Sequence, residues 1–257
     1  MQVKSYLDRI GIEKREDPSL KYLAELQNHH LLSIPFEDLD IPGKRIELDL
    51  EKIYNKIIPT KRGGFCYELN GLFHWLLTNL GFKVDMLSAR VFNSQKNEFG
   101  PEFDHMTLMV HLDKDYLVDA GFGDSFRVPL EFPESEVKDE SGHYRLKQHG
   151  TASGGTLING NSFELVKENE NDWKPQYLFT LKPRKFNDYK EMCDFQQDSP
   201  ASHFRTRMLC TIATEDGRIT LGNDSLTITN GKSKNKISFE SKEEFNTYLK
   251  NYFDIEL

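Results

Sequence analysis

The sequence predicts an α+β protein in which helices come first, strands follow and the C-terminal part is mixed. Apolar residues recur at helical spacing over the first 82 residues, and from Val84 onward they alternate with the period of two that is typical of strands. Helices and strands that are segregated along the chain indicate an α+β fold and argue against alternating βαβ units. The 257 residues are enough for one or two structural units, or three small ones, with a substantial core.

Three helices are expected in the N-terminal part. Asp17 and Pro18 predict the start of the first, with Asp17 as N-cap and Pro18 in the first helical position. After a turn-rich stretch over 34–43, Asp49 is expected to cap a short second helix. The clearest helix has a single apolar stripe and ends at Gly81 in a left-handed cap. The stripe consists of Leu69, Leu72, Phe73, Leu76, Leu77 and Leu80.

Most of the remaining elements are expected to be strands. They lie at 84–92, 105–112, 116–119, 162–166, 177–181, 205–213, 218–221, 225–229 and 236–239. A polar, variable loop is expected over 131–156, and a short helix over 188–197 stops at Pro200. The last helix opens with Ser241 and Glu244, which form a capping box.

Composition excludes several classes of function. Lys and Arg total 33 against 41 Asp and Glu, a net charge of −8, and no basic block offers a nucleic-acid surface. No apolar run approaches the roughly 18 residues of a membrane-spanning helix, and the N-terminus has no signal-peptide pattern. The three cysteines fit a reducing compartment and lack the C-x-x-C spacing of zinc sites. We therefore expect a soluble, cytoplasmic protein that binds no nucleic acid, membrane or metal.

Cys66 is the first candidate for chemistry. It follows Gly63 and Gly64, where the backbone can turn sharply, and stands at the N-terminus of the strongest predicted helix. The helix dipole and the free N–H groups there favour an anion, so they are expected to lower the pKa of a thiol and to bind an oxyanion. The alternative is a small buried core thiol, because Cys66 lies three residues before Leu69 on the apolar face.

A thiolate nucleophile needs a base and a group that orients the base. His105 and His111 lie in the predicted strand after Cys66, and this strand turns back towards Asp119. Asp119 follows apolar residues, where a carboxylate needs a partner, so it is a candidate for orienting an imidazole. The alternative is a hairpin acid that faces solvent.

The spacing alone does not bring these residues together. A simple hairpin that turns at 113–115 places Asp119 opposite Met109, with His105 four residues further along. A bulge, a longer twist or another strand must therefore close the gap. By spacing alone, His111 competes with His105 as the base.

Six segments in order carry a pattern that spans nearly the whole chain. They are 6–11 (YLDRIG), 34–39 (IPFEDL), 62–70 (RGGFCYELN), the strand that begins at His105, 118–123 (VDAGFG) and 199–204 (SPASHF). With these segments the chain resembles the arylamine N-acetyltransferases, for which R-G-G-x-C followed by V-D-x-G-F-G is specific.

The resemblance implies a papain-like cysteine transferase core in three parts. These are a helical bundle over 1–83 with the nucleophile, a β-barrel over 84–186 with the histidine and the acid, and a C-terminal α/β lid over 187–257. By the family pattern Cys66 is the acyl-accepting nucleophile, His105 the base and Asp119 the acid that orients it.

The resemblance also implies binding positions. Phe36 and Phe122 match positions that line the acceptor pocket, and Phe122, Gly123 and Phe204 match positions near the pantetheine arm of the coenzyme. A charged trio near the nucleophile is implied to tie the bundle together; it consists of Arg9, Glu37 and Arg62.

The chain departs from the family pattern at two acids. Asp104 precedes His105 where many members carry a small or hydroxyl residue, and it adds a negative charge beside the site. Asp38 stands where Asn is usual. The coenzyme phosphates need cations, and the candidates by charge alone are Lys182, Arg184, Lys185, Arg205 and Arg207.

The implied activity is acetyl transfer from acetyl-coenzyme A to the nitrogen of aromatic amines and hydrazines, by a ping-pong mechanism through acetyl-Cys66. One alternative is a papain-like hydrolase or transglutaminase-type amidase with the same triad, which would use water or a peptide amine as acceptor. The full-length pattern with Gly121, Phe122 and Gly123 argues against it. The other is an inactive binding module, which would lack a triad member, yet all three residue types are present.

Overall fold

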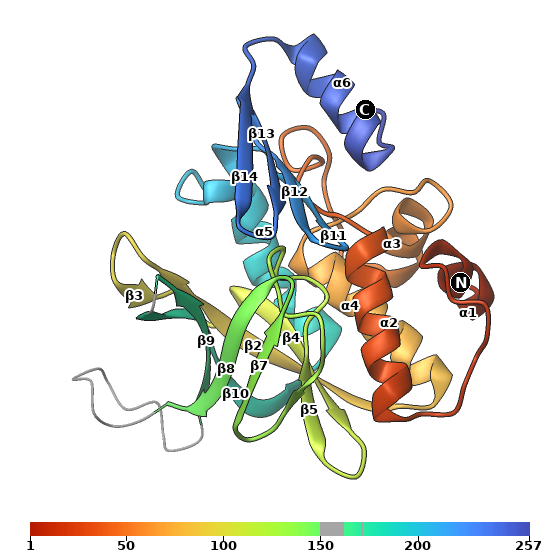
Figure 1. Ribbon diagram of the computed structural model, residues 1–257. Coiled ribbons are helices and arrows are strands. Elements are labelled where there is room, and N and C mark those ends of the chain that lie inside the picture. Colours follow the sequence, from red (N-terminus) through yellow and green to blue (C-terminus); the bar gives the residue numbers. More distant parts are fainter. Residues whose placement is uncertain (150–161, 171) are drawn as a thin grey trace.

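The computed structural model describes residues 1–149, 162–170 and 172–257. Helices gather on one side of the molecule, a strongly curved sheet forms the other side, and a smaller sheet with the last helix lies above both (Figure 1). This arrangement confirms the predicted α+β class. No helix in the described ranges is long and apolar enough to cross a membrane.

Four helices make up the N-terminal bundle. They are α1 (Val3–Arg9), α2 (Leu20–Ser33), α3 (Leu50–Ile57) and α4 (Cys66–Leu80). Every residue of the predicted stripe on α4 is buried, and Gly81 ends the helix at φ 98°, as expected. Asp49 caps α3 by accepting the N–H groups of Glu51 and Lys52.

The predicted cap of α2 is wrong. Ser19 takes this position in place of Asp17, because its backbone is extended and its hydroxyl accepts the N–H of Tyr22 at 3.2 Å. Pro18 therefore lies before the helix and not in its first turn.

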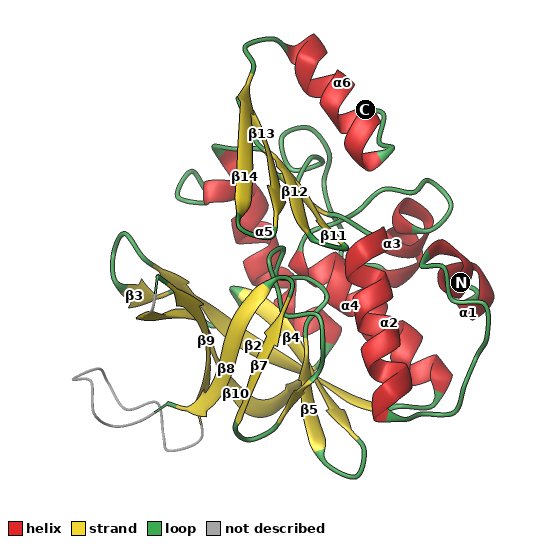
Figure 2. Cartoon of the chain, in the orientation of Figure 1, coloured by secondary structure: helices red, strands yellow, loops and turns green. Residues whose placement is uncertain are grey.

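The large sheet has nine strands and curls into a nearly closed barrel (Figure 2). The strands are β2 (Lys83–Asn93), β3 (Glu98–Phe99), β4 (His105–His111), β5 (Asp115–Val118), β6 (Leu130–Glu131), β7 (Ser135–Asp139), β8 (Gly142–Gln148), β9 (Ser162–Asn169) and β10 (Asp172–Arg184). Their order is β6-β5-β4-β2-β10-β9-β8-β7, with β3 paired to β2 outside this path. The predicted hairpin of 162–166 with 177–181 is confirmed as the longer pair β9–β10.

The loop expected over 131–156 is wrong for its described part. β7 and β8 form an antiparallel hairpin there, and residues 150–156 lie outside the described residues. Tyr144 and Leu146 point into the barrel and are fully buried, while charged residues occupy the alternate positions. The many charges on the outer face conceal this short alternation in the sequence.

The C-terminal part contains the small sheet and two helices. Its elements are α5 (Lys190–Asp198), β11 (Cys210–Thr214), β12 (Gly217–Leu221), β13 (Ser225–Asn230), β14 (Ser233–Ser238) and α6 (Lys242–Phe253), with short 3₁₀ turns at Phe186–Tyr189 and His203–Arg205. The strand predicted over 205–213 begins only at Cys210, because the second of these turns occupies its start. Ser241 and Glu244 form the predicted capping box of α6.

A two-residue strand near the N-terminus joins this sheet. β1 (Phe36–Glu37) pairs with β11 at the edge of the sheet, and Phe36 also bridges to Gly64 beside the start of α4. The small sheet is thereby connected directly to the segment that precedes Cys66.

Candidate active site

The segment before Cys66 requires glycine because another chain lies against it. A Cβ on Gly63 would lie 2.0 Å from the carbonyl oxygen of Pro35. The carbonyl oxygen of Gly64 accepts the N–H of Glu37 at 2.9 Å. The backbone then enters α4, so Cys66 is the first helical residue, as the sequence predicts.

The segment that follows β5 and contains Asp119 lies directly against the start of α4. A Cβ on Gly121 would stand 2.8 Å from the carbonyl oxygen of Cys66 and 3.0 Å from its Cα. Only glycine allows the backbone after Asp119 to approach the nucleophile this closely.

Asn70 connects the nucleophile helix to both other parts of the site. It lies one turn after Cys66 on the same helix face, and its Nδ2 donates to the carbonyl of Met106 at 2.6 Å and to Oδ1 of Asp119 at 3.0 Å. Its Oδ1 accepts the N–H of Ala120 at 2.9 Å. Sequence reasoning missed this residue, although an amide four residues after the cysteine on a buried stripe was a usable signal.

His105 and Asp119 are hydrogen-bonded, with 2.7 Å between Nε2 and Oδ2, and both side chains are buried. The predicted register of the hairpin is wrong by two residues. His111 pairs with Asp115 and Leu108 with Val118, so the turn starts earlier and Asp119 comes level with residue 107 and not with Met109. The two side chains are then diagonal neighbours on one face, which is within reach for an imidazole and a carboxylate.

The partners of Asp119 determine its charge and the tautomer of His105. Burial by itself would raise the pKa of Asp119, but His105, Asn70 and the N–H of Gly121 outweigh it and keep the pKa below its usual value. Because an ionised carboxylate only accepts hydrogen bonds, we assign the imidazole proton to Nε2. Nδ1 of His105 has no hydrogen-bond partner in the described part of the chain and is available to accept a proton.

His111 lies at the opposite end of β4 from His105. Its Nδ1 is 2.6 Å from Asp115 and its Nε2 is 3.0 Å from Asp85, so both ring nitrogens are engaged by carboxylates. The structure therefore brings Asp119 to His105 and leaves His111 away from it.

The helix terminus does not by itself activate Cys66. Burial raises the pKa of the thiol well above its ordinary value, and the charges of Asp104 and Asp119 act in the same direction, while a bond with the backbone of Met106 lowers it. The net direction is opposite to the lowered pKa that the position at the helix N-terminus predicts. A thiolate at this position therefore depends on a positive neighbour.

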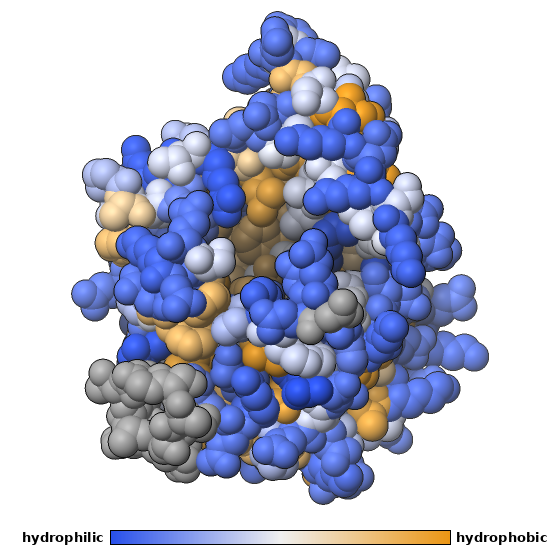
Figure 3. Space-filling view, turned by 60° about the vertical axis from the view of Figure 1, so that its left-hand side comes forward, coloured by the Kyte–Doolittle hydropathy of each residue, from blue (hydrophilic) through white to orange (hydrophobic). Residues whose placement is uncertain are grey.

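Aromatic side chains lie beside His105 and beside Phe65, the residue before Cys66. The ring of Phe122 meets the ring of His105 edge-on at 5.1 Å, and Phe204 meets Phe65 at 6.1 Å. A Cβ on Gly123 would lie 3.5 Å from the ring of Phe36. Of the four residues implied by the resemblance, Phe122 thus lies beside His105, Gly123 beside Phe36, and Phe204 beside the residue that precedes Cys66. The face in Figure 3 is hollowed near its centre, where apolar side chains are exposed on the floor.

The predicted charged trio is correct for two members and wrong for the third. Arg62 donates to Glu37 at 2.8 Å in a largely buried cluster. Arg9 donates instead to the carbonyl of Lys61 at 3.4 Å, outside this cluster. The members of the cluster are Glu37, Asp40, Lys56, Arg62 and Glu68.

The predicted phosphate-binding cations fall into two groups. Arg184 pairs with Glu102, and Arg205 donates to the carbonyl of Gln197 at 3.0 Å. Three others have exposed side chains that form no hydrogen bond or ion pair within the described ranges; they are Lys182, Lys185 and Arg207.

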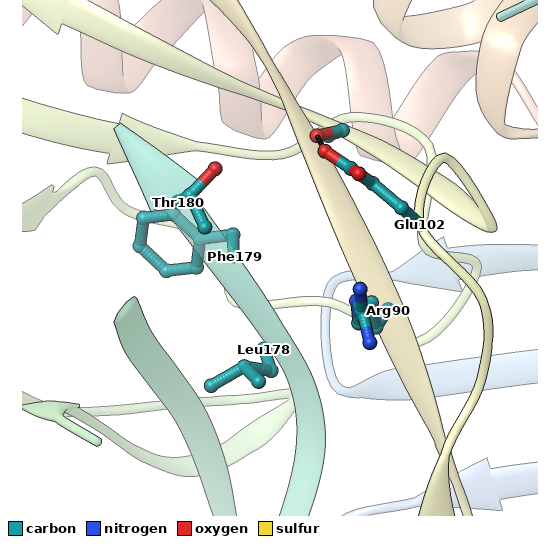
Figure 4. Close-up of a pocket in the computed structure, with 6 residues that line it drawn as sticks. Arg90, Glu102, Leu178, Phe179 and Thr180 are labelled. Carbon is teal, nitrogen blue, oxygen red and sulfur yellow. Dashed lines mark hydrogen bonds between the residues drawn. The ribbon is translucent and has the colours of Figure 1, made fainter. Parts of the chain in front are cut away.

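A small cavity near Glu102 lies on the barrel and not at Cys66. Figure 4 shows Arg90 of β2 facing Leu178, Phe179 and Thr180 of β10, with Glu102 beside them. Its volume of about 50 Å³ is far below that of a substrate pocket. In the described residues no group of three His, Cys, Asp or Glu side chains has the arrangement of a metal site.

Comparisons with known proteins point to one family. A family model described as N-acetyltransferase matches residues 19–257. Arylamine N-acetyltransferase 2 of Mus musculus is 34% identical, and arylamine N-acetyltransferase 1 of Homo sapiens is 32% identical; each alignment covers 100% of this chain and 95% of the relative.

Solved structures agree with this result. Arylamine N-acetyltransferase C from Bacillus anthracis superposes with a TM-score of 0.87 at 27% identity, over 99% of this chain and 98% of that one. The arylamine N-acetyltransferase of M. smegmatis superposes with a TM-score of 0.89 at 31% identity, and the alignment covers 100% of this chain and 93% of that one. A Bacillus cereus arylamine N-acetyltransferase, described as having a Cys-His-Glu catalytic triad, gives 0.87 at 26% identity, over 99% and 98%.

Proposed function

The chain belongs to the arylamine N-acetyltransferase family, and from this premise we propose that it carries an acetyl group from acetyl-coenzyme A to an aromatic amine or hydrazine through acetyl-Cys66. Cys66 is the proposed nucleophile, His105 the base and Asp119 the orienting acid. The observation that carries the proposal is the buried hydrogen bond between His105 and Asp119, which Asn70 ties to α4 one turn after Cys66.

In the first proposed step the thiol proton of Cys66 moves to Nδ1 of His105, and Asp119 stabilises the resulting imidazolium. The thiolate attacks the thioester carbonyl, so a carbon–sulfur bond to Sγ forms as the bond to the coenzyme sulfur breaks. The coenzyme sulfur leaves with the electron pair and takes the proton from His105. One thioester replaces another, so the exchange is nearly thermoneutral and suits a sulfur nucleophile.

The start of α4 is the proposed oxyanion site. The first N–H groups of a helix have no partner within the helix, and they carry the positive end of its dipole. Cys66 is the first residue of α4, so the negative oxygen that forms when Sγ attacks lies near these groups.

In the second proposed step an aromatic amine attacks the acetyl group on Sγ, and a carbon–nitrogen bond forms as the carbon–sulfur bond breaks. His105 takes the proton that the amine loses, and Sγ leaves with the electron pair and recovers a proton from His105. Aromatic amines are weakly basic and uncharged at neutral pH, so they suit an apolar surround that includes Phe36 and Phe122. Phe122, Gly123 and Phe204 are proposed to lie along the pantetheine arm. The exposed cations Lys182, Lys185 and Arg207 are the proposed contacts for the coenzyme phosphates.

Intact-protein mass spectrometry tests this proposal. Mixing the protein with acetyl-coenzyme A and no acceptor is expected to add one acetyl group, which an aromatic amine then removes. Cys66→Ser is expected to show no adduct, whereas Cys193→Ser, which alters another buried cysteine, is expected to keep it. If the unaltered protein gains no acetyl group and releases no free coenzyme A, the proposal is wrong.

A further inference from the structure

Asp104 is an acid next to His105 that the proposed mechanism does not use. Its Oδ1 accepts from Nε2 of Gln196 in α5 at 2.7 Å, and Oε1 of Gln196 in turn accepts from the hydroxyl of Ser202 at 2.9 Å. A Cβ on Gly100 would lie 2.5 Å from Oδ2 of Asp104, so glycine leaves space for the carboxylate on that side. The carboxylate is therefore held in a defined position.

The backbone of this acid is fixed relative to the nucleophile. The hydroxyl of Tyr67, the residue after Cys66, donates to the carbonyl of Phe103 at 2.7 Å. The guanidinium of Arg184 lies over the ring of Phe103 at 4.8 Å. Asp104 thus stands between the first turn of α4 and the strand that carries His105.

The electrostatic surroundings of Cys66 are negative. Asp104 and Asp119 are the two carboxylates that act on its thiol. Asp119 is compensated by His105, but in the described ranges Asp104 forms no ion pair with a lysine or arginine. Arg184, which lies over the neighbouring Phe103, pairs with Glu102 instead.

Burial gives the Asp104 carboxyl a pKa above its usual value, although several neighbours oppose this shift. The opposing neighbours are His105, the backbone of Val91 and the amide of Gln196. When the coenzyme sulfur has left, the acyl group on Sγ is exposed to the charge of a partly buried carboxylate that no lysine or arginine in the described residues neutralises.

Building on the proposed function, we propose that Asp104 determines donor specificity: it admits uncharged acyl groups such as acetyl and propionyl and rejects dicarboxylic ones such as malonyl. A malonyl group on Sγ carries its own carboxylate one carbon beyond the carbonyl, in the field of Asp104. Two like charges a few ångströms apart repel each other strongly where water is partly excluded. Gln196 is the positioning residue that keeps Asp104 in place.

Propionyl- and malonyl-coenzyme A form a matched pair of probes, because a methyl group in one stands where the other has a carboxylate. The experiment measures the rate of acylation of Cys66 by each donor, from coenzyme A release and intact mass. The unaltered protein is expected to favour propionyl. Asp104→Asn, whose Oδ1 can still accept from Gln196, is expected to lower the propionyl-to-malonyl ratio about tenfold.

Asp113→Asn is the control for net charge. It removes the same charge from the exposed turn at the far end of β4 and is expected to leave the ratio unchanged. Asp104→Ser also removes the charge, with a smaller side chain, and is expected to show the same lower propionyl-to-malonyl ratio. If Asp104→Asn does not fold, Asp104→Ser takes its place in the test.

An unchanged ratio in the Asp104 variants, or an equal fall in Asp113→Asn, overturns the proposal. If propionyl acylates Cys66 normally but the ratio does not respond, only this inference fails. If neither acetyl nor propionyl acylates Cys66 in the unaltered protein, the proposed function fails with it.

Discussion

A single buried carboxylate fixes the orientation of the His105 ring. Asp119→Asn is expected to lower kcat/KM by about a hundredfold or more, because an amide cannot stabilise imidazolium and its NH₂ group favours the wrong tautomer. Steady-state kinetics with acetyl-coenzyme A and an aromatic amine at pH 7 measure the effect, and circular dichroism checks the fold. Near-normal kinetics in a folded variant would remove Asp119 from the triad.

Replacing His111, the second histidine of β4, is expected to have little effect on catalysis. His111→Gln loses contacts with Asp85 and Asp115 at the far end of the strand, so it is expected to change kcat/KM by less than about twofold. The cost in unfolding free energy is expected to be about 1 kcal/mol, since the network is partly exposed. A severe kinetic defect in well-folded His111→Gln would make His111, and not His105, the base.

At the level of elements, the sequence allows most helices and long strands to be predicted, because their apolar periods extend over many residues. The capped, striped α4 is an example. The period cannot locate β1, which has two residues, or β7 and β8, whose exposed faces carry many charges. The register of β4 against β5 could not be predicted from the sequence either, because it depends on whether the turn is formed by residues 112–114 or by residues 113–115.

Asn70 shows how one helix residue aligns three elements. Asn70→Ala leaves the carbonyl of Met106, the carboxylate of Asp119 and the N–H of Ala120 each short of a partner in the core. We expect a loss of about 2–4 kcal/mol in unfolding free energy, measured by urea denaturation, together with a reduced kcat.

Asn79→Ala is the matched control for this prediction. Asn79 lies on the same helix, but its side-chain amide is exposed and, among the described residues, donates only to the carbonyl of Trp75. Its replacement is expected to cost less than about 0.5 kcal/mol. Equal losses in the two variants would mean that the contacts of Asn70 add nothing beyond helix propensity.

On the scale of the whole molecule, the described residues form three apolar cores, and the site lies at the first two, since Cys66 belongs to one and Phe122 packs against the other. The largest surrounds α4, the second fills the barrel, and the third lies beneath α6. The order of helices and strands and the motifs predicted the fold and the candidate residues. They could not predict the long-range contacts of Asn70 or Lys56, or the failure of Arg9 to join the charged cluster, because such contacts depend on how separate elements pack.

The junction between β1 and β11, referred to as the seam, contains a buried acid that is expected to make the stability of the protein depend on pH. Asp38 is buried there, and its Oδ1 accepts the N–H of Leu209 at 2.7 Å. Burial raises its pKa from 3.8 to about 7, and the charge of Glu37 adds to this, against the opposing effects of Leu209 and Arg207. The native state therefore binds this proton more tightly than the unfolded chain, so Asp38 lowers the unfolding free energy as the pH rises from about 4 to about 7.

Asp38→Asn keeps the acceptor for Leu209 and removes this penalty. Relative to the unaltered protein, we expect the variant to gain about 2–4 kcal/mol in unfolding free energy between pH 4 and pH 8, measured by urea denaturation. The pKa of Asp40, in the same loop, is shifted in the opposite direction. Burial alone would raise it, but Lys56 and Arg62 hold it below the usual value. Because the folded-state pKa of Asp40 lies below 3.8, its stabilising effect is already present above about pH 4 and is lost only at lower pH. Asp40→Asn should therefore lower the unfolding free energy by nearly the same amount at pH 4 and at pH 8. If the Asp38→Asn difference is the same at both pH values, Asp38 does not titrate within the seam, and its replacement acts through packing alone.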